Sequence, residues 1–168
     1  MLPDTIFTPD ITDLARRVVE ENRAAGRRIT LAESCTGGLV AAALTEIPGA
    51  SDVFELGYVT YSNQAKMVQL GVSGDIIETF GAVSIACAWA MAKGALERSL
   101  ADVAVAISGI AGPSGGTEFK PVGTVVFARV LRSEDNAPEG ELKRFEPVSR
   151  SEIRRQATLC ALELLLLP

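Results

Sequence analysis

The segment ITLAESCTGGLVAAALTEI, residues 29–47, joins a short apolar strand to an amphipathic helix through a Ser-Cys-Thr-Gly-Gly turn. Pro48 and Gly49 end that helix, and its apolar side chains recur at helical spacing, at Leu39, Val40, Ala43, Leu44 and Ile47. A turn between a strand and a helix is the usual place for a ligand in an open α/β sheet. The segment therefore predicts an α/β fold, with a candidate site at the turn.

The rest of the chain continues this alternation. Thr8 and Pro9 begin a helix that Gly26 can stop, and Ser149-Arg-Ser-Glu152 fits the capping box of a last helix. Between them we expect strands at 53–61, 103–107, 124–130 and 141–145, helices at 64–70 and 84–100, a glycine-rich loop at 109–123 and a polar turn at 133–140. This order predicts one domain over residues 1–168, a three-layer α/β/α sandwich with a mixed, mostly parallel sheet.

The composition limits the chemistry available. The sequence contains no histidine, so Ser-His-Asp and Cys-His catalysis and histidine-based metal sites are excluded. The net charge of -5 disfavours nucleic-acid binding, and the three cysteines suggest neither disulfides nor a zinc site. No apolar run reaches the roughly 18 residues of a membrane span, and the N-terminus lacks a signal-peptide pattern. We therefore expect a cytoplasmic protein that binds neither nucleic acid nor a membrane.

Ser34 is the first candidate catalytic residue. It directly follows a predicted strand, and the backbone N–H groups of Thr36, Gly37 and Gly38 are placed to hold an oxyanion or a phosphate at the start of the next helix. The two glycines leave room for a ligand to approach. Simple capping of the helix by Ser34 or Thr36 explains the same residues about equally well.

A second strand end leads into Lys66 and is expected to open on the same edge of the sheet. Lys66 falls near the first turn of a predicted helix, where the helix dipole and partial burial both favour the neutral amine. A neutral lysine can be the general base that activates a serine hydroxyl. Tyr61 and Asn63 are placed to orient the amine or the substrate. The alternatives are a solvated lysine, with Tyr61 and Asn63 in packing and capping roles.

Two further segments are candidates for ligand binding. The stretch from Ser108 to Thr124 has neither a Walker nor a dinucleotide-binding pattern and suits a mobile loop over a small ligand, or an uncommitted surface loop. Arg150 and Arg154 lie on one helical face near a helix start, where cations are unfavourable. We interpret the pair as a clamp for a phosphate; the alternative is a solvated face paired with neighbouring glutamates.

Taken together, these segments resemble the CinA C-terminal domain family, the nicotinamide-nucleotide amidases. The resemblance rests on motifs in the family's order that cover nearly the whole chain: AESCTGG at 32–38, YVTYSNQAK at 58–66, GAVS at 81–84, SGIAGP at 108–113 and KPVGT at 120–124. We expect a stand-alone form, without the larger N-terminal domain of fused CinA proteins.

The resemblance implies an α/β/α fold, homo-oligomeric assembly, no cofactor and no metal. It implies hydrolysis of nicotinamide mononucleotide to nicotinate mononucleotide and ammonia, with Ser34 as nucleophile, Lys66 as its base and Tyr61 as a supporting catalytic group. The expected substrate-binding residues are Thr36, Gly37, Gly38, Asn63, Ser108, Gly109, Arg150 and Arg154. Rival hypotheses are a non-catalytic nucleotide-binding or competence-related module, and a serine amidase for another small amide.

Overall fold

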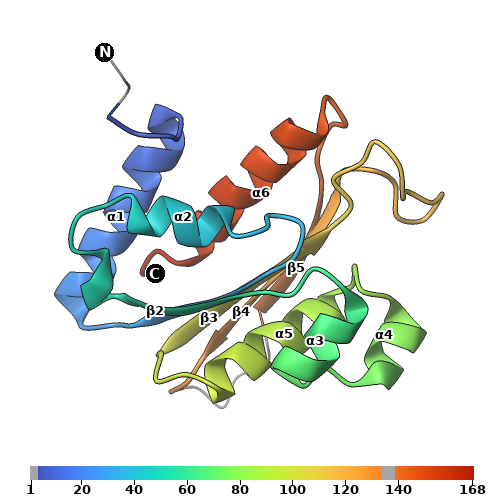
Figure 1. Ribbon diagram of the computed structural model, residues 1–168, viewed down its shortest axis with the longest axis horizontal. Helices are drawn as coiled ribbons and strands as arrows, with labels where there is room; N and C mark the ends of the chain where they lie inside the picture. Colours follow the sequence, from blue (N-terminus) through green and yellow to red (C-terminus); the bar gives the residue numbers. More distant parts are fainter. Residues whose placement is uncertain (1–3, 134–138) are drawn as a thin grey trace.

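The computed structural model describes residues 4–133 and 139–168, and Figure 1 shows one central sheet with helices on both sides. The helices are α1 (Pro9–Ala25), α2 (Leu39–Thr45), α3 (Asn63–Leu70), α4 (Gly74–Phe80), α5 (Ile85–Glu97) and α6 (Arg150–Leu164), with a 3₁₀ helix at Ala50–Asp52. The strands are β1 (Ile29–Glu33), β2 (Phe54–Val59), β3 (Val103–Gly109), β4 (Thr124–Leu131) and β5 (Glu139–Arg144). None of these described helices is both long enough and apolar enough to cross a membrane.

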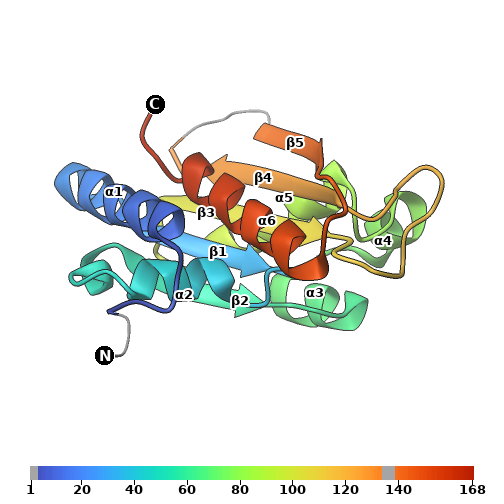
Figure 2. The same ribbon diagram turned by 90° about the horizontal axis from the view of Figure 1, so that it is seen from above.

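The sheet has the strand order β2-β1-β3-β4-β5. β1 pairs in parallel with β2 and with β3, whereas β4 runs antiparallel to both of its neighbours. Every described strand except β4 therefore points the same way. Because helices cover both faces (Figure 2), the predicted three-layer α/β/α sandwich with a mixed, mostly parallel sheet is confirmed.

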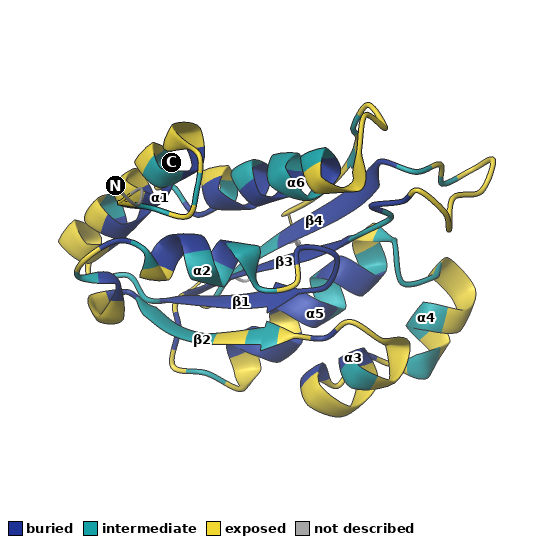
Figure 3. Cartoon of the chain, turned by 45° about the horizontal axis from the view of Figure 1, so that its top comes forward, coloured by how far each residue is buried: buried dark blue, intermediate teal, exposed yellow. Residues whose placement is uncertain are grey.

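Two apolar layers hold the helices on the sheet. α1, α2 and α6 pack on one face, around side chains such as Leu31, Val105 and Phe127. α5 packs on the other face, around Ala104 and Ala106, with α3 and α4 beside it. β1 and β3 are buried almost throughout (Figure 3), as their continuous apolar sequences predict. Residues at the ends of these central strands are therefore attached to the best-packed part of the molecule.

Serine side chains cap the N-termini of α3, α5 and α6. The side chains of Ser62, Ser84 and Ser149 accept hydrogen bonds from backbone N–H groups in the first turns of α3, α5 and α6. Thr8 occupies the cap position of α1 without such a bond, since its hydroxyl donates to Asp10 instead. The Ser62 cap matters most for the site, because it holds the helical turn that carries a buried lysine.

Some elements differ from the sequence-based expectation. α4 was not predicted, because it is a single short segment that buries no side chain fully, although Ile76 and Ile77 pack against the core under α5. The Ser73 hydroxyl caps it. β3 continues to Gly109, since its last residues pair with β4. β5 begins at Glu139, within the predicted turn at 133–140, because Glu139 pairs with Arg129 of β4. Residues 134–138 of that turn lie outside the described part of the chain.

Candidate active site

Three strand ends and the start of α6 meet at one edge of the sheet. Ser34 follows β1 directly, Tyr61 comes two residues after β2, and Gly109 ends β3. Because β1 pairs in parallel with β2 and β3, these three ends lie side by side. Arg150, the first residue of α6, reaches the same edge and donates a hydrogen bond to the Tyr61 hydroxyl. The structure therefore brings the Ser34 turn and the segment that contains Lys66 together, as the sequence predicted.

Ser34 and Lys66 form a buried pair. Lys66 Nζ lies 3.1 Å from Ser34 Oγ and 2.9 Å from the carbonyl oxygen of Thr60, to which it donates a hydrogen bond. Lys66 is 1% exposed and Ser34 is 7% exposed. Lys66 lies one helical turn into α3, behind the Ser62 cap. This burial excludes the alternative of a solvated surface lysine.

Burial also shifts the protonation equilibrium of Lys66 toward the neutral amine. The pKa of Lys66 is lowered, because desolvation disfavours the charged ammonium form. Across residues 4–133 and 139–168, the ion pairs do not include Lys66, so no carboxylate offsets this cost. A neutral amine next to a hydroxyl can accept its proton. The arrangement is therefore suited to general-base activation of Ser34.

Cys35 lies next to Ser34 but is poorly suited to be a nucleophile. Burial raises the pKa of its thiol to about 11. The thiolate, which is the reactive form, is therefore scarce near neutral pH. A side chain at Gly109 would meet the Cys35 Sγ at 3.1 Å, so the glycine allows β3 to end close against this thiol. Cys35 thus packs behind the serine, and Gly109 accommodates that packing.

Glu33 holds the turn after Ser34, although sequence reasoning did not single it out. Its carboxylate is only 1% exposed and accepts three backbone hydrogen bonds of 3.0–3.2 Å at the start of α2, from Gly38, Val40 and Ala41. An acidic residue just before a helix is favoured by the helix dipole, and this was the signal available in the sequence. Glu33 therefore anchors the nucleophile turn to α2.

Two of the N–H groups predicted to hold an oxyanion are already bonded. The Gly38 N–H donates to Glu33, and the Gly37 N–H donates to the Ser34 carbonyl at 2.9 Å. Both glycines have positive φ angles, 59° for Gly37 and 101° for Gly38, which side chains would strain. The glycines therefore shape the turn, and the expectation that residues 36–38 all offer free donors is wrong for these two.

A polar cavity of about 270 Å³ opens beside Ser34. Arg150 lies in its wall and donates hydrogen bonds to the Tyr61 hydroxyl at 2.7 Å and to the Gly112 carbonyl at 2.6 Å. Among the described residues Arg150 has no carboxylate partner, in contrast to the alternative of pairing with nearby glutamates. An unneutralised guanidinium in a polar wall favours a ligand with an anionic group. Arg150 therefore connects Tyr61 to the glycine-rich loop, because it donates hydrogen bonds to both.

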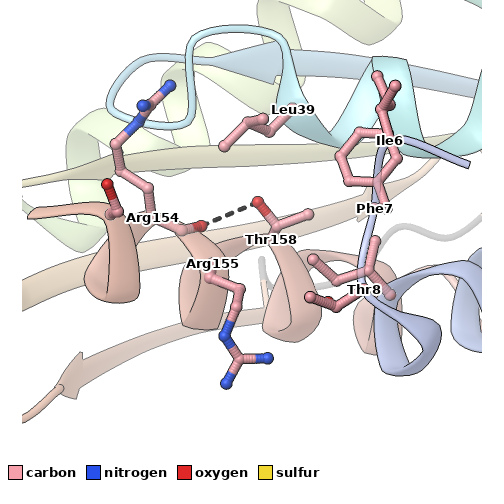
Figure 4. A pocket seen from close by; sticks show the side chains of 9 residues that line it. Ile6, Phe7, Thr8, Leu39, Arg154, Arg155 and Thr158 are labelled. Carbon is pink, nitrogen blue, oxygen red and sulfur yellow. Dashed lines mark hydrogen bonds between the residues drawn. The ribbon is translucent and has the colours of Figure 1, made fainter. Parts of the chain in front are cut away.

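Arg154 has different neighbours. Its Nε donates to the Cys35 carbonyl at 3.0 Å, and its second guanidinium nitrogen lies 3.4 Å from the Thr36 carbonyl. Arg154 also lines a second, mostly apolar cavity of about 280 Å³ between α6, α2 and the N-terminal segment, where it points away from Arg155 (Figure 4). The two arginines therefore do not form the predicted clamp, because Arg150 lines the cavity beside Ser34 and Arg154 does not.

Three other predicted substrate-binding side chains also lie outside the wall of that cavity. The Ser108 hydroxyl donates to the Ala82 carbonyl at 2.8 Å. Thr36 is fully buried, and its hydroxyl has no partner in the described part of the chain. Asn63 is an exposed first residue of α3. Sequence reasoning also missed the carbonyls of Thr60 and Gly112, since a backbone acceptor leaves no signal in the residue type.

The fold and this site define a three-layer α/β protein with a buried serine–lysine pair at the carboxyl edge of its sheet. Residues 11–167 match the family model described as the CinA C-terminal domain. The chain belongs to the CinA C-terminal domain family, as its motifs predicted.

Curated relatives are longer than this chain. It is 48% identical over 166 residues to a CinA-like protein of Mycolicibacterium paratuberculosis, a match that covers 96% of this chain and 37% of that protein. It is 60% identical over 103 residues to a putative competence-damage inducible protein of Symbiobacterium thermophilum, over 61% of this chain and 24% of that protein. The chain thus spans little more than a third of the length of these relatives.

Solved structures of similar length share the whole fold. The competence/damage inducible protein CihA from Agrobacterium tumefaciens matches with a TM-score of 0.92 and 47% identity, over 96% of both chains. A competence-damaged protein (CinA) superfamily protein from Escherichia coli matches with a TM-score of 0.87 and 36% identity, over 96% of this chain and 92% of that one. These names describe a family and leave the reaction open.

Proposed function

We propose that this protein is an amidase that hydrolyses the carboxamide of nicotinamide mononucleotide to nicotinate mononucleotide and ammonia. The observation that carries the chemistry is the 3.1 Å contact between Lys66 Nζ and Ser34 Oγ, with both side chains buried. The choice of substrate comes from the resemblance to nicotinamide-nucleotide amidases. Arg150 in the cavity wall supports it, because a guanidinium there suits the phosphate of that substrate.

The proposed reaction has two stages. Neutral Lys66 accepts the Ser34 proton while Oγ attacks the carboxamide carbon, and the tetrahedral intermediate then loses its C–N bond. Lys66 passes the proton to the leaving nitrogen, which departs as ammonia. In the second stage, neutral Lys66 accepts a proton from a water molecule as its oxygen attacks the acyl-enzyme. Lys66 then gives this proton to Ser34 Oγ when the ester C–O bond breaks. The Thr60 carbonyl, which accepts a hydrogen bond from Nζ at 2.9 Å, keeps the amine in place through both stages.

Ammonia release from nicotinamide mononucleotide tests this proposal. Wild-type protein is expected to release ammonia, and Ser34→Ala is expected to reduce kcat by at least about 10³-fold, because the nucleophile is lost. Mass spectrometry of protein quenched during turnover should show Ser34 esterified by the carboxyl group of nicotinate mononucleotide, with the ribose phosphate still attached. Wild-type protein that binds the nucleotide without releasing ammonia would favour the non-catalytic module. If the protein hydrolysed a different small amide but not nicotinamide mononucleotide, the rival hypothesis of a serine amidase with another substrate would be favoured.

Arg150→Ala is expected to raise KM for nicotinamide mononucleotide about 10- to 100-fold with little change in kcat. A hydrogen bond to a charged group is worth about 1.5–3 kcal/mol, and contact with a remote phosphate acts equally on ground and transition states. Steady-state kinetics with nicotinamide riboside, which lacks the phosphate, should show a much smaller change. Arg155→Ala is the matched control, since Arg155 pairs with Asp10 and Glu152 outside this cavity. Equal KM increases for both substrates would contradict the phosphate contact.

A further inference from the structure

The turn after Ser34 contains a line of hydrogen bonds that runs from Arg154 to the wall of the cavity. One guanidinium nitrogen of Arg154 lies 3.4 Å from the Thr36 carbonyl. The Gly37 N–H, which belongs to the same peptide unit as that carbonyl, donates to the Ser34 carbonyl at 2.9 Å. The N–H in the peptide unit of the Ser34 carbonyl is that of Cys35. Arg154 is therefore connected to the Cys35 N–H through two peptide units.

Peptide geometry gives this line a direction. In a trans peptide unit the C=O and the N–H point to opposite sides. Because the Ser34 carbonyl faces the Gly37 N–H, the Cys35 N–H points away from Gly37. In residues 4–133 and 139–168 this N–H donates no hydrogen bond to another residue, and the acceptor that it faces is the weakly accepting thiol of Cys35 itself. Cys35 lines the cavity together with Ser34. An unpaired N–H next to a nucleophile is a natural partner for a developing oxyanion.

The other N–H groups of the turn are less suitable. The Ser34 N–H donates to the Ile107 carbonyl at 2.9 Å. Those of Gly37 and Gly38 are bonded to Ser34 and Glu33, as described above. Thr36 is fully buried and does not line the cavity. The Cys35 N–H is thus the donor of this turn that has no partner in another described residue and that belongs to a residue lining the cavity.

Arg154 contributes position and charge to this donor. Its Nε bond to the Cys35 carbonyl, at 3.0 Å, holds the peptide unit that follows the donor. Hydrogen bonds in a line polarise one another, so a guanidinium at the far end makes the last N–H more positive. Arg154 also contacts the turn at Gly37, where an added Cβ would lie 3.4 Å from the guanidinium. A shorter or neutral side chain would lose these effects.

We propose that the Cys35 N–H stabilises the oxyanion and that Arg154 is the positioning residue that orients and polarises it. This inference rests on the proposed amidase function, since attack by Ser34 is what creates an oxyanion at this place. It gives Arg154 a role different from the phosphate contact that its spacing from Arg150 suggested.

A small ethyl fluorophosphonate probe tests the inference without the nucleotide substrate. Ser34 Oγ forms a bond to phosphorus, fluoride leaves, and the serine proton passes to Lys66, while the phosphoryl oxygen needs the same donor as an oxyanion. Arg154→Ala is expected to slow this labelling about 10- to 100-fold, somewhat less than the direct loss of an oxyanion donor. The midpoint of its pH dependence should stay unchanged, because Lys66 is untouched. Arg154→Lys should recover part of the rate, and Arg155→Ala should react like wild type.

If Arg154→Ala were labelled at the wild-type rate, the inference would be overturned. A slower reaction with a shifted pH midpoint would also overturn it, because it would mean that the Ser34–Lys66 pair had moved. Wild-type protein that is not labelled on Ser34 would contradict the proposed function itself.

A second experiment removes the Cys35 N–H donor alone. Lactic acid in place of Cys35 replaces its N–H by an ester oxygen, and Cys35→Ala is the matched amide. The ester should react about 10²- to 10³-fold more slowly than the amide, and equal rates would exclude this donor.

Discussion

Replacing Lys66 by methionine is expected to lower kcat for amide hydrolysis by about 10²- to 10⁴-fold, the usual contribution of a general base. KM should change little, because the lysine amine contacts Ser34 and the Thr60 carbonyl and does not line the cavity. Methionine has a similar length and an apolar chain, so it can fill the same buried space. Ammonia release at saturating substrate measures the effect.

Lys93→Met is the matched control. Lys93 lies on α5 with its side chain 53% exposed, over the Trp89 ring and near Glu97. Its replacement should leave kcat at the wild-type value. If Lys66→Met kept wild-type activity, Lys66 would not be the base, and Ser34 would need another activating group.

The lowered pKa of Lys66 also predicts a pH dependence of activity. The amine must be neutral to accept the Ser34 proton, so kcat/KM should rise with pH through the lowered pKa and then reach a plateau. Rates measured across this range with the wild type and with Arg150→Ala should share the same midpoint. A rate that rises only near the ordinary lysine value of 10.5 would show that burial does not lower this pKa in solution.

The same pKa shift links Lys66 to stability. Between the lowered folded-state pKa and the unfolded-state value near 10.5, the unfolded chain binds more protons than the folded one. The free energy of unfolding of the wild type should therefore rise with pH across this window. Lys66→Met removes that contribution, so it should be more stable than wild type at low pH, with the advantage shrinking as pH rises. Urea unfolding at a series of pH values measures both curves.

Gly94→Ala is expected to destabilise the protein by about 2–3 kcal/mol through overpacking. Gly94 lies on α5 where it crosses the end of α3, and an added Cβ would lie 2.0 Å from the Leu70 carbonyl oxygen. Because that atom is backbone, α3 as a whole would have to move, and this outweighs the roughly 1 kcal/mol that alanine contributes in a helix. For a chain of this length the loss corresponds to a fall in Tm of roughly 6–9 °C.

The displaced helix carries Lys66, so Gly94→Ala should also reduce kcat at temperatures where the variant is folded. Gly74→Ala is the matched control, because its added Cβ would meet only the end of the flexible Met67 side chain, at 3.3 Å. It should leave both Tm and kcat near the wild-type values. A Tm for Gly94→Ala within about 2 °C of wild type would show that α3 and α5 can separate at little cost.

Local signals explain why much of the fold was predictable. The apolar run of β3 and the caps at Ser84 and Ser149 act over a few residues, so they can be recognised without knowing the tertiary structure. α4 shows the converse, because its seven residues offer only a short apolar pattern and no fully buried side chain. The absence of histidine was equally informative, since it left lysine as the most suitable base for Ser34.

The arginines show where spacing was not enough. A separation of four residues places Arg150 and Arg154 on one face of α6, but such long side chains can choose different partners. Arg150 extends over the cavity to Tyr61, whereas Arg154 turns to the carbonyls of the nucleophile turn. The partners of Glu33 could not be read from the sequence either. They are backbone N–H groups that come within reach only when the turn brings α2 back over β1.

Ser34 was therefore a candidate from its position between a strand and a helix, and Lys66 from its position near a helix start. The identities of these two residues and the order of strands and helices around them can be recognised from short stretches of the sequence. The 3.1 Å distance between them, the burial that lowers the lysine pKa and the choice of free N–H donor depend on tertiary packing. Desolvation and hydrogen-bond partners come from segments far apart in the sequence, and these are defined only once the sheet edge is assembled.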